Sequence, residues 1–394
     1  MKRGALIFEK RIRKTPQGRY FDTVFTDKVL SRYASVVDEL VLLVRVDPLD
    51  LPEEEIRKRF SEITLPNARV IEIGNVLSPR GLLRMPAMWK KIRDCLARMD
   101  VVFLRIPSIW QDRVVRFAKK HGIPCILEVG ADVWDTYWHS DWKGKLLAPW
   151  LEHSTKRIVR HAAHVVYVTE RYLQAKYPTA GETLACSNVD IVAQPDEVLE
   201  QRLAKIRAWE SPVRLGTLAS VSTRSKGQDC VIRALARLKS MGRHGYVYHL
   251  AGAGNPDRLL RLAESLGVAD QVHCDGVLRH DQIGEWFRSI DIYVQPSRQE
   301  GLPRALIEAM SFALPAIGAH TGGIPELLPD SCIFRHGSSP VPGICSILDS
   351  FSPDVLCRLS RANFARAADF DARILEPRRH DFFLSAIRRP LTCP

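Results

Sequence analysis

The 394-residue chain lacks a long apolar run. No stretch of it approaches the roughly 18 consecutive apolar residues that a membrane-spanning helix requires. Near the N-terminus only four apolar positions, 5–8, precede Glu9, which is too few for the apolar region of a signal peptide. The sequence therefore predicts neither an integral membrane protein nor a secreted precursor.

Paired cysteines are also lacking. The nine cysteines are odd in number and scattered, without a Cys-x-x-Cys pair, and several lie in apolar runs, as Cys125 does in 123–127. This pattern excludes a disulfide framework or a zinc cage and is typical of small buried side chains in a reducing compartment. We therefore expect a cytoplasmic protein.

Acidic residues are fewer than basic ones. The chain has 57 Lys and Arg against 45 Asp and Glu, a formal net charge of +12, with 46% hydrophobic residues. That is the composition of a soluble globular protein and excludes global disorder. The positive excess favours a polyanionic partner, which is a nucleic acid, an anionic membrane surface or a phosphorylated substrate. Nucleic acid is disfavoured because the basic residues are dispersed and no recognised binding module is present.

Short apolar runs alternate with longer amphipathic stretches along the whole chain. This rhythm favours parallel strands joined by helical crossovers. The expected strands cover residues 5–8, 39–46, 70–73, 101–106, 124–129 and 165–168 in the first half, and 213–218, 247–251, 271–274, 291–295, 315–319 and 332–334 in the second. We therefore expect an α/β protein with two doubly wound, Rossmann-like domains.

The alternation of apolar and amphipathic stretches is interrupted between residues 193 and 211, where no strand is expected. We place an N-terminal domain at 1–194, an interdomain linker at 195–212 and a C-terminal domain at 213–375. Residues 376–394 form a tail of helical tendency, which we expect to pack back on the N-terminal domain. Open parallel sheets bind ligands at the carboxyl ends of their strands, so motifs at those ends are the candidate functional residues.

The stretch 295–310, QPSRQEGLPRALIEAM, is the most informative of these motifs. An expected strand runs into a turn rich in Pro, Ser and Gly and then into a helix, with Glu300 in the turn and Glu308 about two helical turns along. An ionised carboxylate accepts hydrogen bonds from two hydroxyls side by side, which suits a sugar. The alternative interpretation is a solvated helix with a capping carboxylate.

The backbone of the same stretch is suited to an anion. Amides at Gly301, at Leu302 and after Pro303 are expected at the helix N-terminus, where free donors and the helix dipole favour a group such as a diphosphate. A second anion contact is Lys226, in the loop 220–227 that follows the expected strand 213–218. A lysine at a helix start is a natural phosphate clamp, although such a lysine is also often merely solvated.

These residues resemble the retaining nucleotide-sugar glycosyltransferases of family four, which have the GT-B architecture of two Rossmann-like domains facing a central cleft. Their signature is two glutamates separated by seven residues in the context EG-x-P…E-A-M, and Glu300 and Glu308 match it. The resemblance implies that Glu300 contacts the donor sugar, Glu308 holds the ribose hydroxyls and Lys226 grips the pyrophosphate. The arginine that usually assists falls on Ser220 or Val221, and we expect Arg224 to compensate.

In the first domain the resemblance is looser. The basic stretch 9–19 is expected as a loop after the first strand, with Gly18 near the donor phosphates or simply a turn glycine. Many relatives carry a histidine at the end of a later strand. Here Glu128 or Asp132 holds that place and becomes the candidate for assisting the acceptor, the alternative being a surface acid.

Residues 77–99 are expected to form an amphipathic helix in which leucine, methionine and tryptophan alternate with lysine and arginine. Two interpretations stay open: the helix lies on an anionic membrane, or its apolar face packs on its own sheet.

The expected function is therefore a metal-independent, retaining glycosyltransferase without a cofactor. It would move a sugar from a nucleotide-diphosphate donor to a hydroxyl of a growing surface glycan or lipid-linked acceptor, as in exopolysaccharide or lipopolysaccharide biosynthesis. Expected partners are the donor, that acceptor and an anionic membrane at the inner face of the plasma membrane, but no nucleic acid. The alternatives are a non-catalytic GT-B protein that binds a nucleotide or glycan, and a sugar-nucleotide epimerase.

Overall fold

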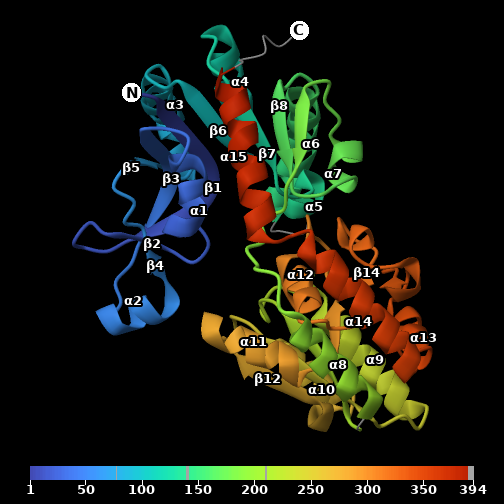
Figure 1. The fold of residues 1–394 in the computed structure, drawn as a ribbon. Coiled ribbons are helices and arrows are strands. Elements are labelled where there is room, and N and C mark those ends of the chain that lie inside the picture. Colours follow the sequence, from blue (N-terminus) through green and yellow to red (C-terminus); the bar gives the residue numbers. More distant parts are fainter. Residues whose placement is uncertain (77, 139–141, 209–210, 389–394) are drawn as a thin grey trace. The chain divides into compact units, whose positions relative to one another are not determined.

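The computed structural model describes residues 1–76, 78–138, 142–208 and 211–388 (Figure 1). By its internal contacts the chain divides into two units. The first comprises Met1–Val168, Leu173–Cys186 and Glu376–Pro394, and the second comprises Thr169–Tyr172 and Ser187–Leu375.

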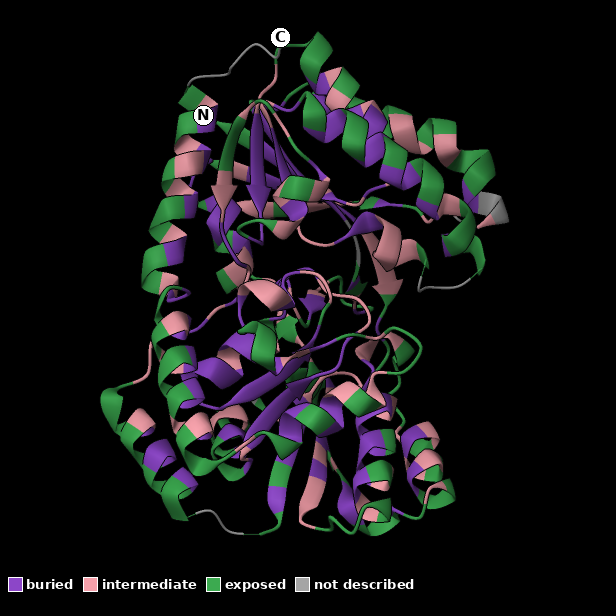
Figure 2. Ribbon diagram, turned by 90° about the vertical axis from the view of Figure 1, so that its right-hand side faces the viewer, coloured by how far each residue is buried: buried purple, intermediate pink, exposed green. Residues whose placement is uncertain are grey.

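The first unit is built on a mainly parallel sheet. Its strands are β1 (Arg3–Lys14), β2 (Tyr20–Asp22), β3 (Glu39–Pro48), β4 (Ser61–Glu62), β5 (Ala68–Ile73), β6 (Val101–Ile106), β7 (Cys125–Val129), β8 (His164–Tyr167) and β9 (Glu182–Ala185). The parallel strands run in the order β5-β3-β1-β6-β7-β8-β9, while β2 pairs antiparallel with the last residues of β1 and β4 pairs antiparallel with β2. Central strands such as β3 and β6 are nearly continuous apolar runs because helices cover both faces (Figure 2).

The helices of this unit occupy the connections between strands. They are α1 (Asp27–Ala34), α2 (Glu53–Arg59), α3 (Pro79–Leu96), α4 (Gln111–Lys120), α5 (Val133–Trp138), α6 (Trp142–Arg160), α7 (Tyr172–Lys176) and the greater part of α15 (Ala372–Arg388). In the tail, Phe383 is fully buried and packs against Tyr33 of α1 and Phe103 of β6, and Glu376 pairs with Arg32 at 2.7 Å. Residues 376–388 thus belong to the apolar core of the first unit.

The expected loop over 9–19 is wrong in its first half, because β1 continues to Lys14. Ile12 is fully buried, whereas charged residues near it find partners on β3, which pairs with β1, and on β5, the next strand beyond β3. Arg11 lies 3.2 Å from Asp47, and Lys14 lies 2.7 Å from Glu72. Cross-strand ion pairs therefore allow a basic sequence to form a strand where its composition suggested a loop.

The second unit contains a parallel sheet in the order β12-β11-β10-β13-β14-β15. Its strands are β10 (Val213–Leu218), β11 (Tyr246–Ala251), β12 (Val272–Gly276), β13 (Ile292–Gln295), β14 (Ala316–Ala319) and β15 (Ile333–Phe334). Its helices are α8 (Asp196–Ala208), α9 (Gln228–Ser240), α10 (Asp257–Ser265), α11 (His280–Ser289), α12 (Arg304–Ser311), α13 (Val341–Asp349) and α14 (Pro353–Ala368), with short 3₁₀ turns η1 (Arg224–Lys226), η2 (Ala269–Gln271), η3 (Ile324–Glu326) and η4 (Asp330–Cys332).

The strand order of the second unit reverses between β10 and β13. From β10 the chain proceeds outward to β11 and β12, and then returns to place β13, β14 and β15 on the other side. A reversal of this kind opens a crevice at the carboxyl ends of the two strands, which is where doubly wound sheets bind ligands. The expected fold class of two doubly wound, Rossmann-like sheets is confirmed.

Residues 195–212, expected as the interdomain linker, include helix α8, which packs within the second unit. The buried guanidinium of Arg202 donates to the carbonyl oxygens of Phe287 at 2.8 Å and Ile290 at 2.7 Å. Burial lowers the pKa of Arg202 to about 10. These contacts hold α8 to the end of α11.

The helix expected over 77–99 is α3, and its two halves differ. Ile92 and Leu96 are fully buried, and Trp89 stacks on Trp110 with ring centroids 6.2 Å apart, so the second half packs on its own unit. Leu82 and Leu83 in the first half are exposed. Leu77 lies outside the described residues. Within the described ranges, no helix is both long and apolar enough to cross a membrane.

Candidate functional site

The carboxyl ends of β10 and β13 bring two candidate residues together. Lys226 is the last residue of η1, in the connection after β10, and Glu300 lies in the turn after β13. The Lys226 ammonium lies 2.6 Å from Oε1 of Glu300, and both side chains are partly buried. Residues 74 positions apart in the sequence thus form an ion pair at the point where the strand order reverses.

Hydrogen bonds from side chains of β13 hold the Glu300 carboxylate in place. Gln295, the last residue of β13, donates from Nε2 to Glu300 Oε1 at 3.1 Å, and the hydroxyl of Tyr293 donates to Gln295 Oε1 at 3.1 Å. Burial, together with the negative charges of Glu308 and Glu300, raises the pKa of Tyr293 well above its ordinary value. Both glutamates therefore act electrostatically on the same buried tyrosine, although they come from different parts of the motif.

Helix α12 begins at Arg304, directly after the buried residues Gly301, Leu302 and Pro303. The N-cap residue of this helix is Pro303, whose side chain makes no hydrogen bond to the first turn. Glu308 follows on the same helix and is half-buried. The structure therefore places the second glutamate and the start of the helix in the same turn-and-helix unit as Glu300, as the sequence predicts.

Glycines let the loops of the site approach one another at backbone distance. A Cβ atom on Gly227, whose φ is +72°, would lie 1.9 Å from the carbonyl oxygen of Pro296. On Gly322, whose φ is +55°, it would lie 2.3 Å from the carbonyl oxygen of Glu300. Real Cβ atoms essentially never come within 3.0 Å of another heavy atom, so these contacts exist only because the residues are glycine.

Arg298 is a residue of the site that the sequence interpretation did not include. Its guanidinium makes two hydrogen bonds to the Asp229 carboxylate, at 2.8 and 2.9 Å, and a third to the carbonyl oxygen of Arg224 at 2.8 Å. Burial alone would raise the pKa of Asp229, but the Arg298 contacts outweigh it and the net pKa is lowered. The clamp ties the turn that carries Glu300 to the loop that carries Lys226.

The position where the resemblance leads one to expect an arginine, Ser220 or Val221, lies in a small polar network. The Thr223 hydroxyl donates to the Ser220 hydroxyl at 3.0 Å, and Gln228 donates to the Ser220 carbonyl at 2.9 Å. The Arg224 side chain is exposed beside this network, so its expected role toward phosphate stays a prediction. Within the described ranges no group of three or more His, Cys, Asp or Glu residues is arranged to hold a metal ion.

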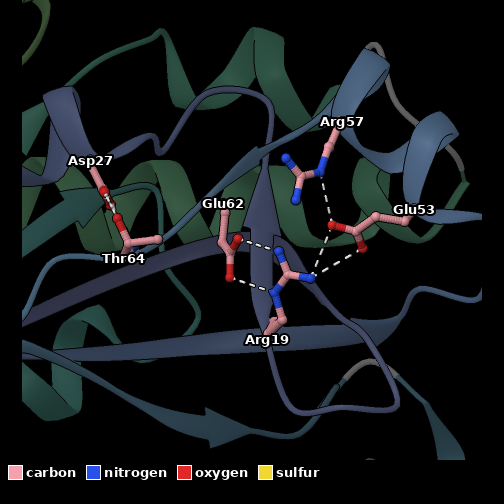
Figure 3. Close-up of polar contacts among 6 residues, drawn as sticks. All are labelled: Arg19, Asp27, Glu53, Arg57, Glu62 and Thr64. Carbon is pink, nitrogen blue, oxygen red and sulfur yellow. Dashed lines mark hydrogen bonds and ion pairs between the residues drawn. The ribbon is translucent and has the colours of Figure 1, made fainter.

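Gly18 lies in the turn between β1 and β2. Its amide donates to the Thr15 carbonyl at 2.9 Å, its φ is +83°, and a Cβ atom there would meet nothing within 4 Å. The adjacent Arg19 is engaged by two carboxylates, at 2.7 Å from Glu62 and 3.1 Å from Glu53 (Figure 3). Gly18 is therefore a turn glycine, and its expected place near the donor phosphates stays a prediction.

Glu128 at the end of β7 is not a surface acid, because only 5% of the residue is exposed. The Tyr33 hydroxyl donates to its Oε2 at 2.9 Å, and Arg105 lies 3.8 Å away. Its Oε1 is buried without a hydrogen-bond partner among the described residues. Burial, followed by the Glu128 charge, raises the pKa of Tyr33.

Asp132 is also buried, but it is engaged at both oxygens. One accepts from the Asp135 amide at 3.1 Å at the start of α5, and the other pairs with Lys176. These contacts give Asp132 a structural role within the first unit. The assignment of Glu128 or Asp132 to the acceptor stays a prediction.

Comparison with known proteins matches one region of the chain to a family model. Residues 208–331 match the family model described as glycosyl transferases group 1. This segment contains Lys226, Glu300 and Glu308 together with the Arg298 clamp.

Two relatives differ in how much of this chain they match. Protein CapJ of Staphylococcus aureus is 25% identical over 320 residues, which are 80% of this chain and 78% of the relative. A D-inositol 3-phosphate glycosyltransferase of Streptomyces coelicolor is 32% identical over 124 residues, which are 30% of this chain and 27% of the relative. The similarity to the second is thus confined to about a quarter of that protein's length.

Solved structures match nearly the whole chain at low identity. Sucrose-phosphate synthase from Thermosynechococcus elongatus has a TM-score of 0.67 and 14% identity, and covers 97% of this chain and 98% of its own. Anabaena HepE in complex with UDP-glucose has a TM-score of 0.64 and 15% identity, covering 98% and 100%. WaaG, a glycosyltransferase involved in lipopolysaccharide biosynthesis, has a TM-score of 0.60 and 17% identity, covering 96% and 98%. These likenesses establish the GT-B fold.

Proposed function

We propose that the protein is a retaining glycosyltransferase that moves a sugar from a nucleotide-diphosphate donor to a hydroxyl of a surface glycan or lipid-linked acceptor. The observation that carries the proposal is the ion pair of Lys226 and Glu300 at the reversal of strand order, beside the start of α12. The match of residues 208–331 to group 1 glycosyl transferases supports it.

Each group of the site has a part in donor binding. The Lys226 ammonium and the amides around Gly301 and Leu302 take the diphosphate, because together they place positive charge and free donors on one side of the turn. Glu300 takes hydroxyls of the sugar, and Glu308 takes those of the ribose. Without the donor, Lys226 and Glu300 pair with each other at 2.6 Å. When the donor binds, its phosphate pairs with the Lys226 ammonium and a sugar hydroxyl donates to the Glu300 carboxylate, so two contacts replace one.

Lys226 also acts in the chemical step. As the bond between the anomeric carbon and the phosphate oxygen breaks, negative charge develops on the leaving diphosphate, and the ammonium and the helix amides stabilise it. The acceptor hydroxyl attacks the anomeric carbon from the face that the diphosphate leaves, and its proton passes to the departing phosphate oxygen. The sugar thus keeps its anomeric configuration, and the groups named here supply the charge stabilisation without a metal ion.

Two neighbours indicate the donors and acceptors to try first. HepE was solved with UDP-glucose, and WaaG acts in lipopolysaccharide biosynthesis. UDP-glucose is therefore the first donor to test, and a lipid-linked saccharide is the first acceptor class.

The test is a thermal-shift screen of the protein with UDP-, GDP-, ADP- and dTDP-sugars, repeated with Glu308→Ala. A ligand at about 100 times its dissociation constant stabilises a protein by about 2.7 kcal/mol, which is readily detected. We expect one nucleotide class to raise the melting temperature of the wild type and to lose most of that effect in Glu308→Ala. No shift with any nucleotide-sugar would contradict the proposal.

Turnover is tested separately with the donor found in that screen. Lys226→Met is expected to lower the rate of the chemical step by about a hundredfold or more, as for loss of one charge-stabilising group. Product anomers are read by NMR, and the assay is repeated with a chelator. An inverted product would overturn retention, activity abolished by the chelator would overturn metal independence, and donor binding without turnover would favour a non-catalytic role.

A further inference from the structure

Gln295 is the last residue of strand β13 and lies five positions before Glu300. Only 2% of it is exposed, and a buried polar side chain ordinarily has hydrogen-bond partners. Its Nε2 donates to the Ser297 hydroxyl at 2.9 Å and to Glu300 Oε1 at 3.1 Å, and its own Oε1 accepts from the Tyr293 hydroxyl at 3.1 Å. Both ends of the buried amide are therefore engaged within one short motif.

These contacts fix which end of the amide faces Glu300. An ionised carboxylate can only accept hydrogen bonds, so the nitrogen of the amide must face it and the oxygen must face away. On the far side the Tyr293 hydroxyl donates to the amide oxygen, and burial raises the pKa of Tyr293 well above its ordinary value, so this hydroxyl keeps its proton. The Gln295 amide is thus held with its N–H groups toward the carboxylate.

The two groups that hold Glu300 share one of its oxygens. Lys226 Nζ lies 2.6 Å from Oε1, and Gln295 Nε2 lies 3.1 Å from the same atom. No described residue donates to Oε2, and 12% of the Glu300 side chain is exposed. Oε2 is therefore the oxygen left to accept from a ligand hydroxyl.

The same two groups differ in what they do when a nucleotide-sugar binds. Lys226 is a point charge on a flexible side chain, and it leaves Oε1 when it pairs with the diphosphate. Gln295 has no comparable alternative, because it is buried and its other contacts, Ser297 and Tyr293, belong to the same motif. In the complex the amide is then the contact that keeps the carboxylate in place.

We propose that Gln295 is a positioning residue of the candidate donor site: it holds Glu300 by Oε1 in the nucleotide-sugar complex, so that Oε2 meets the sugar hydroxyls. The inference rests on the proposed function, in which Lys226 takes the diphosphate and Glu300 takes the sugar. It gives Gln295 a part in recognising the sugar and none in recognising the nucleotide. The expected signature is a loss of affinity that depends on whether the ligand carries a sugar.

The test compares a nucleotide-sugar with its nucleotide diphosphate in calorimetry of the full chain. UDP-glucose and UDP are the first pair, and the pair of another nucleotide class replaces them if the thermal-shift screen selects that class. Gln295→Met keeps the length of the side chain and removes both N–H donors. We expect it to lower the affinity for the nucleotide-sugar about tenfold or more, as for loss of a hydrogen bond to a charged group, and to leave the affinity for the diphosphate unchanged.

Gln271→Met is the matched control. Gln271 ends η2 in the same unit, is 5% exposed, and donates from Nε2 to the Tyr246 carbonyl oxygen at 2.8 Å. The control therefore makes the same chemical change at a buried position, but the amide it removes bonds to β11 instead of the turn after β13. We expect both variants to lose thermal stability, and only Gln295→Met to lose affinity for the nucleotide-sugar.

Gln295→Glu gives a readout that packing alone would not move. The new side chain has the same shape, but it donates to Glu300 only when the two carboxyl groups share a proton, and their proximity raises the pKa at which they take one up. The charges of Lys226 and Glu308, on η1 and α12, act on both proteins, so the ratio to wild type isolates the new group. Nucleotide-sugar affinity relative to wild type should be low at about pH 8 and recover toward about pH 5, while that of Gln295→Met stays constant.

The failures of the inference and of the proposed function are distinguishable. A wild type that binds neither a nucleotide-sugar nor a nucleotide diphosphate would overturn the proposed function, and this inference with it. A wild type that binds the nucleotide-sugar while Gln295→Met binds it equally well would overturn this inference alone. Equal losses for the nucleotide-sugar and the diphosphate in Gln295→Met would also overturn it, because Gln295 would then support the whole loop instead of the sugar contact.

Discussion

Replacing Gly227 by alanine is the sharpest test of how the site is built. The added Cβ atom would lie 1.9 Å from the Pro296 carbonyl oxygen, whereas ordinary contact begins at 3.4 Å, so the two loops must separate by more than one ångström. That movement pulls the turn carrying Glu300 away from the loop carrying Lys226. Misplacement of reacting groups by about 1 Å costs about a hundredfold in rate, and we expect a loss of that order with weakened donor binding.

The chain supplies a matched control for this substitution. Gly242 has a φ of +77°, close to the +72° of Gly227, but it is exposed and a Cβ atom there would meet nothing within 4 Å. Alanine in the left-handed region costs about 1–2 kcal/mol at either position. For a unit of this size that corresponds to a fall in melting temperature of roughly 2–8 °C. The two variants therefore share the backbone strain, and only Gly227→Ala adds the collision.

The assay is thermal denaturation of both variants with and without the donor that stabilises the wild type, followed by turnover. Gly242→Ala should retain the full donor-induced shift and the wild-type rate. Gly227→Ala should lose both. Equal donor-induced shifts in the two variants would refute the reasoning, because the loops would then tolerate separation without loss of the site.

Three further predictions concern other parts of the chain. Arg298→Lys cannot keep the paired hydrogen bonds to Asp229, so we expect donor affinity, measured by calorimetry, to fall about tenfold. Adding Asp229→Asn to this variant should lower the affinity little further, because both changes remove the same contact. Additive losses would show that the two residues act separately. The Arg373 guanidinium and backbone amides hold the pKa of Asp371 far below its ordinary value, so Asp371 stabilises the fold above the ordinary carboxyl pKa of about 4 and this stabilisation is lost as the pH falls. The difference in melting temperature between wild type and Asp371→Asn should therefore shrink between pH 7 and pH 3, and a constant difference would contradict the assignment. Glu128→Gln should lower turnover without changing donor binding if the residue assists the acceptor, and an unchanged rate would leave it a structural role.

Much of the fold follows from the sequence because its central strands are buried on both faces. The strands expected at 101–106 and 213–218 are those observed, and the one expected at 291–295 begins one residue later. The strands that escaped prediction are β2, β4 and β9, which have two to four residues; β4 and β9 contain no buried residue, and β2 has only three residues, too few to show a pattern. Short partly exposed strands form by pairing with a neighbour, and their own side chains carry no periodic signal.

The parts of the site that lie within one stretch of sequence were predictable. The parts that depend on contacts between residues far apart in the sequence were not. Glu300, Gly301 and the start of α12 lie within one short motif, so their arrangement follows from a strand, a turn and a helix in succession. Arg298 is part of the same motif, yet its partner Asp229 is 69 residues away, and no spacing rule connects them. The burial of Glu128 was likewise hidden, because Tyr33 and Arg105 reach it from other elements.

The candidate donor site owes its shape chiefly to backbone contacts. Gly227 meets Pro296, and Gly322 meets Glu300, so the loops after β10 and β14 both touch the turn after β13. A Cβ atom on Gly252, whose φ is +145°, would lie 2.1 Å from the Ala219 carbonyl oxygen, so the turn after β11 also touches the loop after β10. Four loops are thus held together at positions where any side chain would force them apart.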